Sequence, residues 1–303
     1  MLRQRVKSVR STQKITKAQE MIATSRIAKA QAKVAASTPY SEMVTAALSA
    51  LASVSSLRHS LLVERDDPKR AAILVITADR GLCGGYNSGA IRTAEELAAL
   101  LRTKGMEPVF YVVGRKGVGY YTFRQRPIEA SWTGFSERPT YADAEAIAAV
   151  LLDGFMAGSD GIASDGEPGV DEVHVVSTHF VSMMTQQPNA RRLGPMEVEY
   201  VEHSSEEHAL LPAYEFEPDA EELLNALLPK YATSRIYAAL LDSAASESAA
   251  RRAACKSATD NANEIIKKLS RQANQARQAQ ITQELSEIVG GADALAAANA
   301  EED

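Results

Sequence analysis

The feature that most constrains this chain is its C-terminal stretch, residues 257–295, which contains no proline. Apolar residues recur there at steps of three and four, the spacing that places side chains on one face of a helix. The stripe consists of Ala262, Ile265, Leu269, Ala273 and Ala276, followed after a phase slip by Ile281, Leu285 and Ile288. A helix of about 40 residues is about 60 Å long, longer than a compact domain requires. We therefore expect it to pair with a second long helix.

Residues 1–57 supply that partner, because they also follow helical spacing. Their stripe consists of Ile15, Ala18, Ile22, Ser25, Ala28 or Lys29, Ala32 and Ala35. Both stripes are rich in small residues, so the two helices should approach closely. The only proline of this region is Pro39, which predicts a kink or a break at Thr38.

The residues between the two helices follow a different period and predict a small α/β domain over 70–215. The apolar run 71–78 reads as a buried strand, since charged residues bound it. A helix over 88–104 and a strand over 108–113 would complete a βαβ unit with parallel strands. The remaining elements that we expect are a helix over 140–155, which Thr140 and Asp143 would cap, and strands over 173–180 and 196–201.

Composition and charge limit the classes of protein. A hydrophobic content of 45% is ample for a core, and the two cysteines lie far apart without metal-ligand spacing, which indicates a reducing, cytoplasmic setting. We expect neither a membrane span nor a signal peptide, because no apolar run is long enough. Residues 1–35 carry nine basic side chains against Glu20 alone, whereas residues 137–222 carry nineteen acidic side chains against three arginines. Basic ends and an acidic middle imply surfaces with different partners, although a charge run is often only a solvated helix face.

A glycine-rich loop, residues 79–87 (DRGLCGGYN), follows the first expected strand. Such loops can bind phosphate through backbone N–H groups, but Gly81, Gly84 and Gly85 do not form a dinucleotide or P-loop motif. We therefore expect these glycines to form a tight structural turn that needs positive φ. The histidines and Cys83 assemble no catalytic or metal-binding pattern, so we expect no cofactor, and the acidic loop 158–172 should be exposed and mobile.

Three segments in order are more specific than their periodicity: residues 15–26 (ITKAQEMIATSR), the 79–87 loop, and residues 281–295 (ITQELSEIVGGADAL). Together they resemble the γ subunit of bacterial F-type ATP synthases. The resemblance implies an antiparallel coiled coil of the N- and C-terminal helices with an inserted Rossmann-like α/β domain that binds no nucleotide. It implies a non-catalytic rotor that couples proton-driven rotation of the c-ring to conformational cycling of a hexamer of α and β subunits. The ε subunit and the c-ring would contact the insert, at the cytoplasmic face of the cell membrane.

The resemblance also implies residues that contact the hexamer. They are Ile15, Thr16, Met21 and Ser25 on the first helix, and Arg277, Gln278, Thr282, Glu284 and Glu287 on the last. Gln19, Arg252, Cys255, Ala273 and Gln275 depart from the commoner family pattern. The domains expected are a helix over 1–57, the α/β domain over 70–215, a helix over 218–295 and an acidic tail over 296–303. The acidic loop 158–172 resembles an insertion, which we expect to reach the c-ring or the stator.

Two other classes remain open on the residues alone. A Rossmann-like nucleotide-dependent enzyme would bind ATP or NAD tightly, and a basic coiled-coil protein would bind nucleic acid with strong salt dependence. Neither class explains three ordered segments, so we expect no nucleic acid among the partners.

Overall fold

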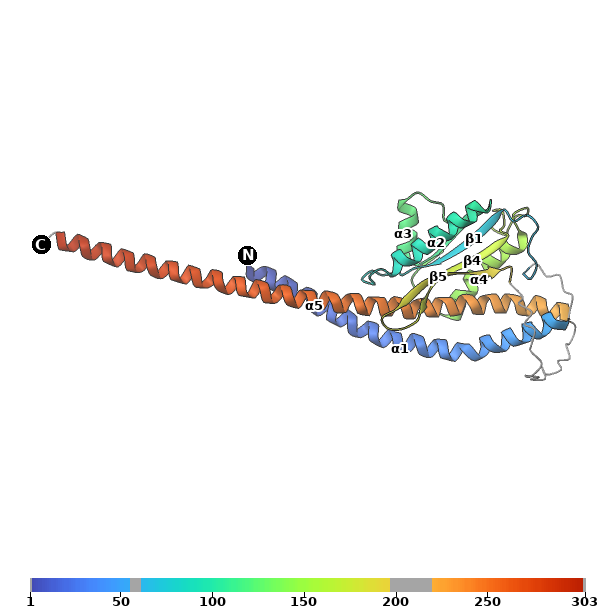
Figure 1. Ribbon diagram of the computed structural model, residues 1–303, viewed down its shortest axis with the longest axis horizontal. Coiled ribbons are helices and arrows are strands. Elements are labelled where there is room, and N and C mark those ends of the chain that lie inside the picture. The colour runs from blue at the N-terminus through green and yellow to red at the C-terminus, as the bar shows by residue number, and fades with distance from the viewer. Residues whose placement is uncertain (1, 55–60, 197–219, 302–303) are drawn as a thin grey trace. The chain divides into compact units, whose positions relative to one another are not determined.

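The computed structural model describes residues 2–54, 61–196 and 220–301. The chain forms two compact units: Met1–Met21 together with Ala254–Asp303, and Ile22–Ala253. We call them the rod unit and the sheet unit. Two long helices pass through both, α1 (Leu2–Val54) and α5 (Ala220–Glu301), as Figure 1 shows.

The rod unit consists of the first part of α1 and the last part of α5, which lie side by side and run in opposite directions (Figure 1). The hydroxyl oxygens of Thr16 and Thr259 lie 2.7 Å apart between them. Beyond Ala273, every described side chain of α5 up to Gly290 is exposed. The antiparallel pairing of the two ends of the chain is confirmed, and α5 continues past its pairing with α1.

The stripe that α1 buries follows strict alternating steps of three and four, a heptad repeat. Its buried or half-buried positions include Leu2, Val6, Val9, Gln13, Thr16, Glu20, Ala23, Ile27, Ala30, Val34, Ser37, Ser41, Val44, Leu48 and Leu51. The stripe predicted from the sequence is therefore wrong, because Ile15, Ala18, Ile22, Ser25 and Ala32 are exposed. Apolar character guided that prediction, whereas several positions that pack inward are small or polar.

On α5 the predicted stripe is correct in part. Ala262 is buried and Leu269 and Ala273 are half-buried. Ile265, in contrast, is exposed and the neighbouring Ile266 is half-buried in its place. A shift of one residue turns a side chain by about 100° around a helix, so two adjacent isoleucines cannot both face the partner.

Of the kink or break predicted at Thr38, the break is wrong, since α1 continues through Pro39 to Val54. Proline removes the backbone donor that would pair with the Ala35 carbonyl. In the same turn, the hydroxyls of Ser37 and Thr38 both donate to the neighbouring Val34 carbonyl, each at 2.9 Å. Val44 and Leu51 are buried in the second half of the helix. Packing of an apolar face contributes more to a helix than local propensity does, which explains why the proline is tolerated.

The sheet unit contains a five-stranded sheet in the order β3-β2-β1-β4-β5. Its strands are β1 (Arg70–Ile76), β2 (Glu107–Val113), β3 (Ala130–Trp132), β4 (Glu172–Phe180) and β5 (Gln186–Gly194). The first four are parallel, and β5 is antiparallel to β4. The predicted parallel βαβ unit is confirmed. The strand predicted over 196–201 falls almost entirely outside the described residues, and Met196 belongs to no strand.

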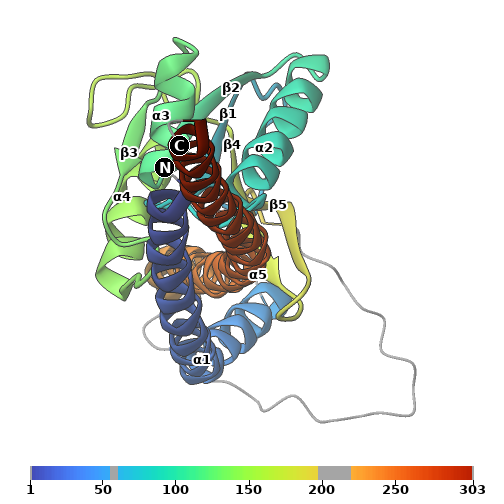
Figure 2. The same ribbon diagram turned by 90° about the vertical axis from the view of Figure 1, so that its left-hand side faces the viewer.

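Helices cover both faces of this sheet, with α2 and α4 on opposite sides of the strands (Figure 2). The helices are α2 (Tyr86–Thr103), α3 (Arg115–Phe123) and α4 (Tyr141–Ala157), and Thr140 and Asp143 form the predicted capping box at the start of α4. The α2 and α3 face buries Ile73, Val75 and Tyr121. The opposite face buries residues of α4 together with Leu228, Ala232, Ile236 and Leu240 of α5. The first part of α5 is therefore part of the core of the sheet unit.

The acidic loop before β4 is tied to its surroundings at its end. Asp171 is 2% exposed, and its carboxylate accepts hydrogen bonds from the backbone N–H groups of Lys69, Arg70 and Ser159 at 2.7–3.1 Å. Burial alone would raise the pKa of Asp171, but these donors outweigh it and hold the pKa below the ordinary value. The expectation of a solvated carboxylate is wrong for Asp171, whereas contact of the loop with a neighbour stays a prediction.

Candidate functional site

The outer surface of the rod unit displays apolar side chains that pack against nothing described. On α1, Ile15 is 58% exposed and Met21 is 61% exposed. On α5, Ile281, Leu285, Ile288 and Val289 are all exposed. Their spacing of four, three and one places them on one face of the helix. We call these four residues the α5 stripe.

Three of these four residues, Ile281, Leu285 and Ile288, were predicted from the sequence to face the partner helix, but they are exposed. They lie beyond Ala273, where the pairing of α5 with α1 has ended. The sequence signal that marks this change is the phase slip after Ala276, which separates the seam from the exposed face. An exposed row of large apolar residues, rimmed by polar ones, is typical of a protein–protein contact.

The five contact residues expected on α5 surround this stripe, and all are exposed. Several are held by bonds along the helix: Gln280 donates to Glu284, and Gln283 donates to Glu287, each at 3.0 Å. The Thr282 hydroxyl donates to the Gln278 carbonyl at 3.0 Å. Arg277 is exposed as well, so these side chains are presented outward with much of their geometry set by the helix.

Of the four contact residues expected on α1, Ile15, Met21 and Ser25 are exposed. Thr16 is different, because it is 6% exposed and directed at α5. Thr259, its partner there, also donates to the Cys255 carbonyl at 2.8 Å. Within the chain, the Thr16 side chain thus serves the pairing of the two helices, at a point where hydroxyls replace apolar packing.

The glycine-rich loop forms a turn between β1 and α2. Among its three glycines only Gly84 has positive φ, at 55°, and the other residue with positive φ is Leu82, at 61°. A side chain at Gly81 or Gly85 would meet only ordinary van der Waals contacts. The need for positive φ therefore holds for Gly84 alone among the three.

Hydrogen bonds attach this loop to the rest of the sheet unit. The Asp79 carboxylate accepts from the N–H groups of Gly134 and Ser136 at 2.8 and 3.0 Å, and from that of Arg115 at 3.1 Å. Burial would raise the pKa of Asp79, but these backbone donors outweigh it and lower the pKa. The Asp79 carboxylate thus accepts hydrogen bonds from the backbone N–H groups that follow β2 and β3. The loop is a compact turn and not an open site for a phosphate.

Arg251 of α5 connects the same loop to the long helix. It is 3% exposed, and its guanidinium donates to the carbonyls of Gly81 and Arg80, both at 3.3 Å. It also donates to Glu247, one turn earlier, at 2.7 Å. A guanidinium has five donors in a planar fork, so it can hold two carbonyls and a carboxylate together.

A second carboxylate completes this cluster. Glu137 lies 3.2 Å from Arg251, in a geometry that gives an ion pair without a hydrogen bond, and it also contacts Arg26 of α1. We call Arg26, Glu137, Glu247 and Arg251 the polar interlock. Burial raises the pKa of Glu247, whereas Arg251 opposes that shift, and both carboxylates keep Arg251 charged against its own burial. The interlock joins α1, α5 and the segment before α4 within the sheet unit.

Within the described residues, no three or more His, Cys, Asp and Glu side chains are grouped so that they could hold a metal ion. His174 pairs with Glu172 and His179 pairs with Asp242, at 2.7 and 2.6 Å. Among the helices described, none is both long and apolar enough to span a bilayer.

Comparison with known proteins decides the family. The sequence profile of the family described as ATP synthase matches residues 1–295. An ATP synthase gamma chain from Saccharopolyspora erythraea is 61% identical over 304 residues, covering 99% of this chain and 98% of that protein. The chain belongs to the ATP synthase gamma chain family. Another gamma chain, from Salinispora arenicola, is 59% identical and covers 99% of this chain and 98% of its own length.

Chains in solved structures of ATP synthases have the same fold. A chain of the Euglena gracilis mitochondrial ATP synthase, from a structure of OSCP, F1 and the c-ring, has a TM-score of 0.67 at 16% identity and covers 98% of this chain and 94% of its own. A chain from the central stalk and c-ring of the Tetrahymena thermophila enzyme has a TM-score of 0.56 at 23% identity, covering 80% and 99%. These chains therefore share the fold of long terminal helices and an inserted sheet.

Proposed function

We propose that the chain is the rotor shaft of the ATP synthase central stalk, and that it couples rotation of a proton-driven c-ring to conformational cycling of the catalytic subunits. The observation that carries this proposal is the α5 stripe, together with membership of the gamma chain family. A row of exposed leucine, isoleucine and valine contributes nothing to the stability of the chain by itself. It gains free energy only when a partner covers it.

The construction of the rod unit suits a shaft. Thr16, Thr259 and Ala262 face the seam, and such small side chains let two helices approach closely. A seam that keeps a seven-residue repeat supercoils and resists bending better than a single helix does. An asymmetric shaft of this kind contacts identical subunits differently, and so favours a different conformation in each.

The partners that we infer are a hexamer of α and β subunits around the rod unit, and ε and the c-ring at the sheet unit. In this proposal the chain has no catalytic residue and associates with the cytoplasmic face of the membrane only through the complex. Nine basic residues in the first 35 favour an acidic lining on the surrounding subunits, which would steer and centre the shaft.

The polar interlock has a place in this mechanism. Within the sheet unit, the packing of Leu228, Ile236 and Leu240 and the bonds of Arg251 attach α5 to the sheet and its loops. Torque applied to the sheet is then delivered to α5 through buried contacts, which deform little. The proposal therefore gives the 79–87 loop a mechanical function.

The test compares two adjacent substitutions on α5, Leu285→Asp and Ser286→Asp. Both side chains are exposed in the chain, so both variants should keep the helix content and thermal stability of the parent. Burying a leucine contributes about 1.5–3 kcal/mol, so Leu285→Asp should weaken binding to separately purified α and β subunits by about tenfold or more. Ser286→Asp should bind as the parent does.

Binding is measured by assembly on an affinity-tagged chain, and coupling by ATP hydrolysis of the reconstituted complex. We expect the tagged parent to co-purify with a membrane-attached ATPase that contains α and β subunits. Equal assembly and equal hydrolysis by the two variants would show that the α5 stripe is not the contact surface. Absence of the chain from the ATPase would remove the rotor proposal altogether.

A further inference from the structure

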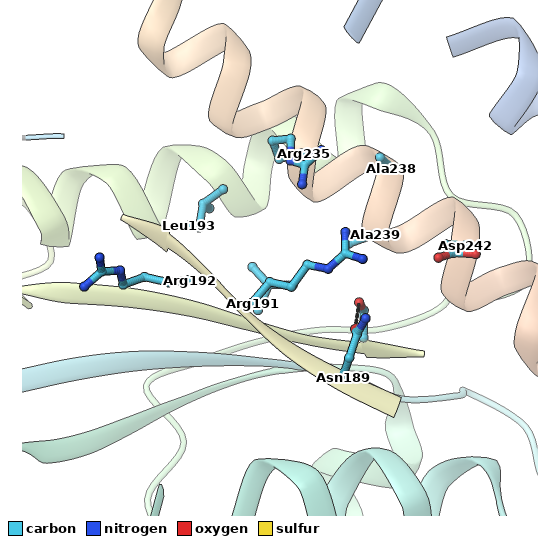
Figure 3. A pocket seen from close by; sticks show the side chains of 10 residues that line it. Asn189, Arg191, Arg192, Leu193, Arg235, Ala238, Ala239 and Asp242 are labelled. Carbon is cyan, nitrogen blue, oxygen red and sulfur yellow. Dashed lines mark hydrogen bonds between the residues drawn. The ribbon is translucent and has the colours of Figure 1, made fainter. Parts of the chain in front are cut away.

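A small cavity of about 100 Å³ lies between β5 and α5, inside the sheet unit (Figure 3). The polar side chains that line it include Ser177, Asn189, Arg191, Arg235 and Asp242. They come from β4, β5 and two successive turns of α5. The rotor proposal uses none of these residues, so the cavity needs its own account.

The positive charge of this cavity is not balanced within the described part of the chain. Neither Arg191 nor Arg235 forms an ion pair with a described carboxylate, although Arg235 lies over the Tyr231 ring at 6.0 Å. Arg191 extends from β5 toward α5, where Arg235 is anchored (Figure 3). The neighbouring Arg192 extends the other way and is engaged by Glu64 at 2.6 Å. Two guanidinium groups therefore face one small space.

Neutral groups add hydrogen-bonding capacity beside the arginines. The Ser177 hydroxyl donates to the Asn189 side-chain oxygen at 3.3 Å, which orients the Asn189 amide and leaves its NH₂ group without a partner in the described residues. The Asp242 carboxylate receives the Phe180 N–H at 2.9 Å and contacts the His179 ring at 2.6 Å. A carboxylate has about four acceptor positions, so Asp242 can still accept one more hydrogen bond.

We propose that this cavity is a binding site for a phosphoryl group. Arginine forks bind phosphate oxygens in pairs, and two of them with the Asn189 amide supply the donors that such a group requires. A volume of about 100 Å³ suits a single tetrahedral oxyanion and is small beside the roughly 300–1,000 Å³ of pockets that enclose a whole organic ligand. A nucleotide could therefore insert only its terminal phosphate.

The carboxylate of Asp242 makes the site selective. Inorganic phosphate keeps at least one proton at neutral pH and can donate it to Asp242, whereas sulfate carries none. A sulfate oxygen would face the Asp242 carboxylate with no proton between them, and two hydrogen-bond acceptors in contact are costly in a small cavity. Phosphate should therefore bind more tightly than sulfate despite their similar size and shape.

The test titrates the full chain with inorganic phosphate, sulfate and ADP by calorimetry. Phosphate should bind at one site, and Arg191→Gln and Arg235→Gln should each weaken it by about tenfold or more, because each removes a charged hydrogen-bond donor. Sulfate should bind about tenfold more weakly than phosphate. The control is Arg102→Gln, an exposed arginine of α2, which should bind phosphate as the parent does. All three variants should melt at the parent's temperature, since each of these arginines is exposed.

Comparing ADP with inorganic phosphate distinguishes the two sources of the phosphoryl group, a nucleotide and free phosphate. Tighter binding of ADP than of phosphate, with the same dependence on both arginines, would identify a nucleotide's terminal phosphate, and equal or weaker binding of ADP would identify free phosphate. The proposal is overturned if phosphate does not saturate the chain at millimolar concentration. It is equally overturned if Arg102→Gln weakens binding as much as the cavity variants do.

Discussion

Replacing Arg251 with methionine tests whether the polar interlock stabilises the sheet unit. The change leaves the Glu247 carboxylate, 1% exposed, without its cation, and leaves the Gly81 and Arg80 carbonyls without their donor. Removing one partner of a buried ion pair costs about 3–5 kcal/mol, because the remaining charge stays desolvated. For a unit of this size each 1 kcal/mol lowers the melting temperature by about 2–4 °C, so a cost of about 3 kcal/mol predicts a fall of about 6–12 °C.

The double variant Glu247→Met with Arg251→Met separates the ion pair from the rest of the interlock. It removes both buried charges, and apolar replacement of a buried pair is often neutral for stability. We therefore expect the double variant to be more stable than Arg251→Met alone, although the two loop carbonyls still lack their donor. The two single changes should then be strongly non-additive.

The chain offers a specific probe for this measurement. Its one tryptophan, Trp132, lies on β3 and packs against the core of the sheet unit, so its fluorescence during urea and thermal unfolding reports that unit. Arg252→Met is the control, because it removes a charge from the adjacent position of α5, and Arg252 takes no part in the ion pairs of the interlock. A melting temperature for Arg251→Met within about 1 °C of the control, or additive effects in the double variant, would refute the reasoning.

Two further predictions concern single buried groups. Thr16→Val should destabilise the rod unit by about 1 kcal/mol, because the buried Thr259 hydroxyl keeps the Cys255 carbonyl as its acceptor but loses its hydrogen bond to Thr16, and adding Thr259→Val should recover part of the loss; circular dichroism during heating checks this. Asp171→Asn should lower stability near neutral pH by about 1.5–3 kcal/mol, the range for hydrogen bonds to a charged group. Since the folded pKa of Asp171 lies below its ordinary 3.8, its contribution is complete above that pH and is lost as the pH falls through the lowered pKa. Unfolding curves of parent and variant should therefore converge at the acid end, and a constant difference down to pH about 2 would contradict the assignment.

The general architecture was predictable because it depends on signals that are local in sequence. A long helical period at each end predicts paired helices, and the apolar runs before and after a helical stretch predict the βαβ unit. The position of the seam was not predictable in the same way. Ile15 and Ile22 are the more apolar residues, yet Thr16 and Ala23 pack inward, because closeness of the two helices favours small side chains over hydrophobic ones.

Strand β5 and the polar interlock were missed for two different reasons. The strand contains Pro188, two arginines and little apolar alternation, which is normal for an edge strand that pairs on one side only. The interlock brings together residues from positions 26, 137, 247 and 251, and no local pattern links a basic residue on the first helix to an acidic one before α4. Its members resemble ordinary surface charges until the fold buries them.

Along α5, the partner that buries the helix changes from one part to the next. Leu228 and Ile236 are buried in the core of the sheet unit, and Thr259 is buried in the seam of the rod unit. The α5 stripe is covered by nothing in the described chain. Each exposed leucine or isoleucine forgoes about 1.5–3 kcal/mol of burial and adds a risk of association. The chain can gain that free energy only from another subunit, so the far end of α5 is better explained by a contact surface than by the stability of the chain.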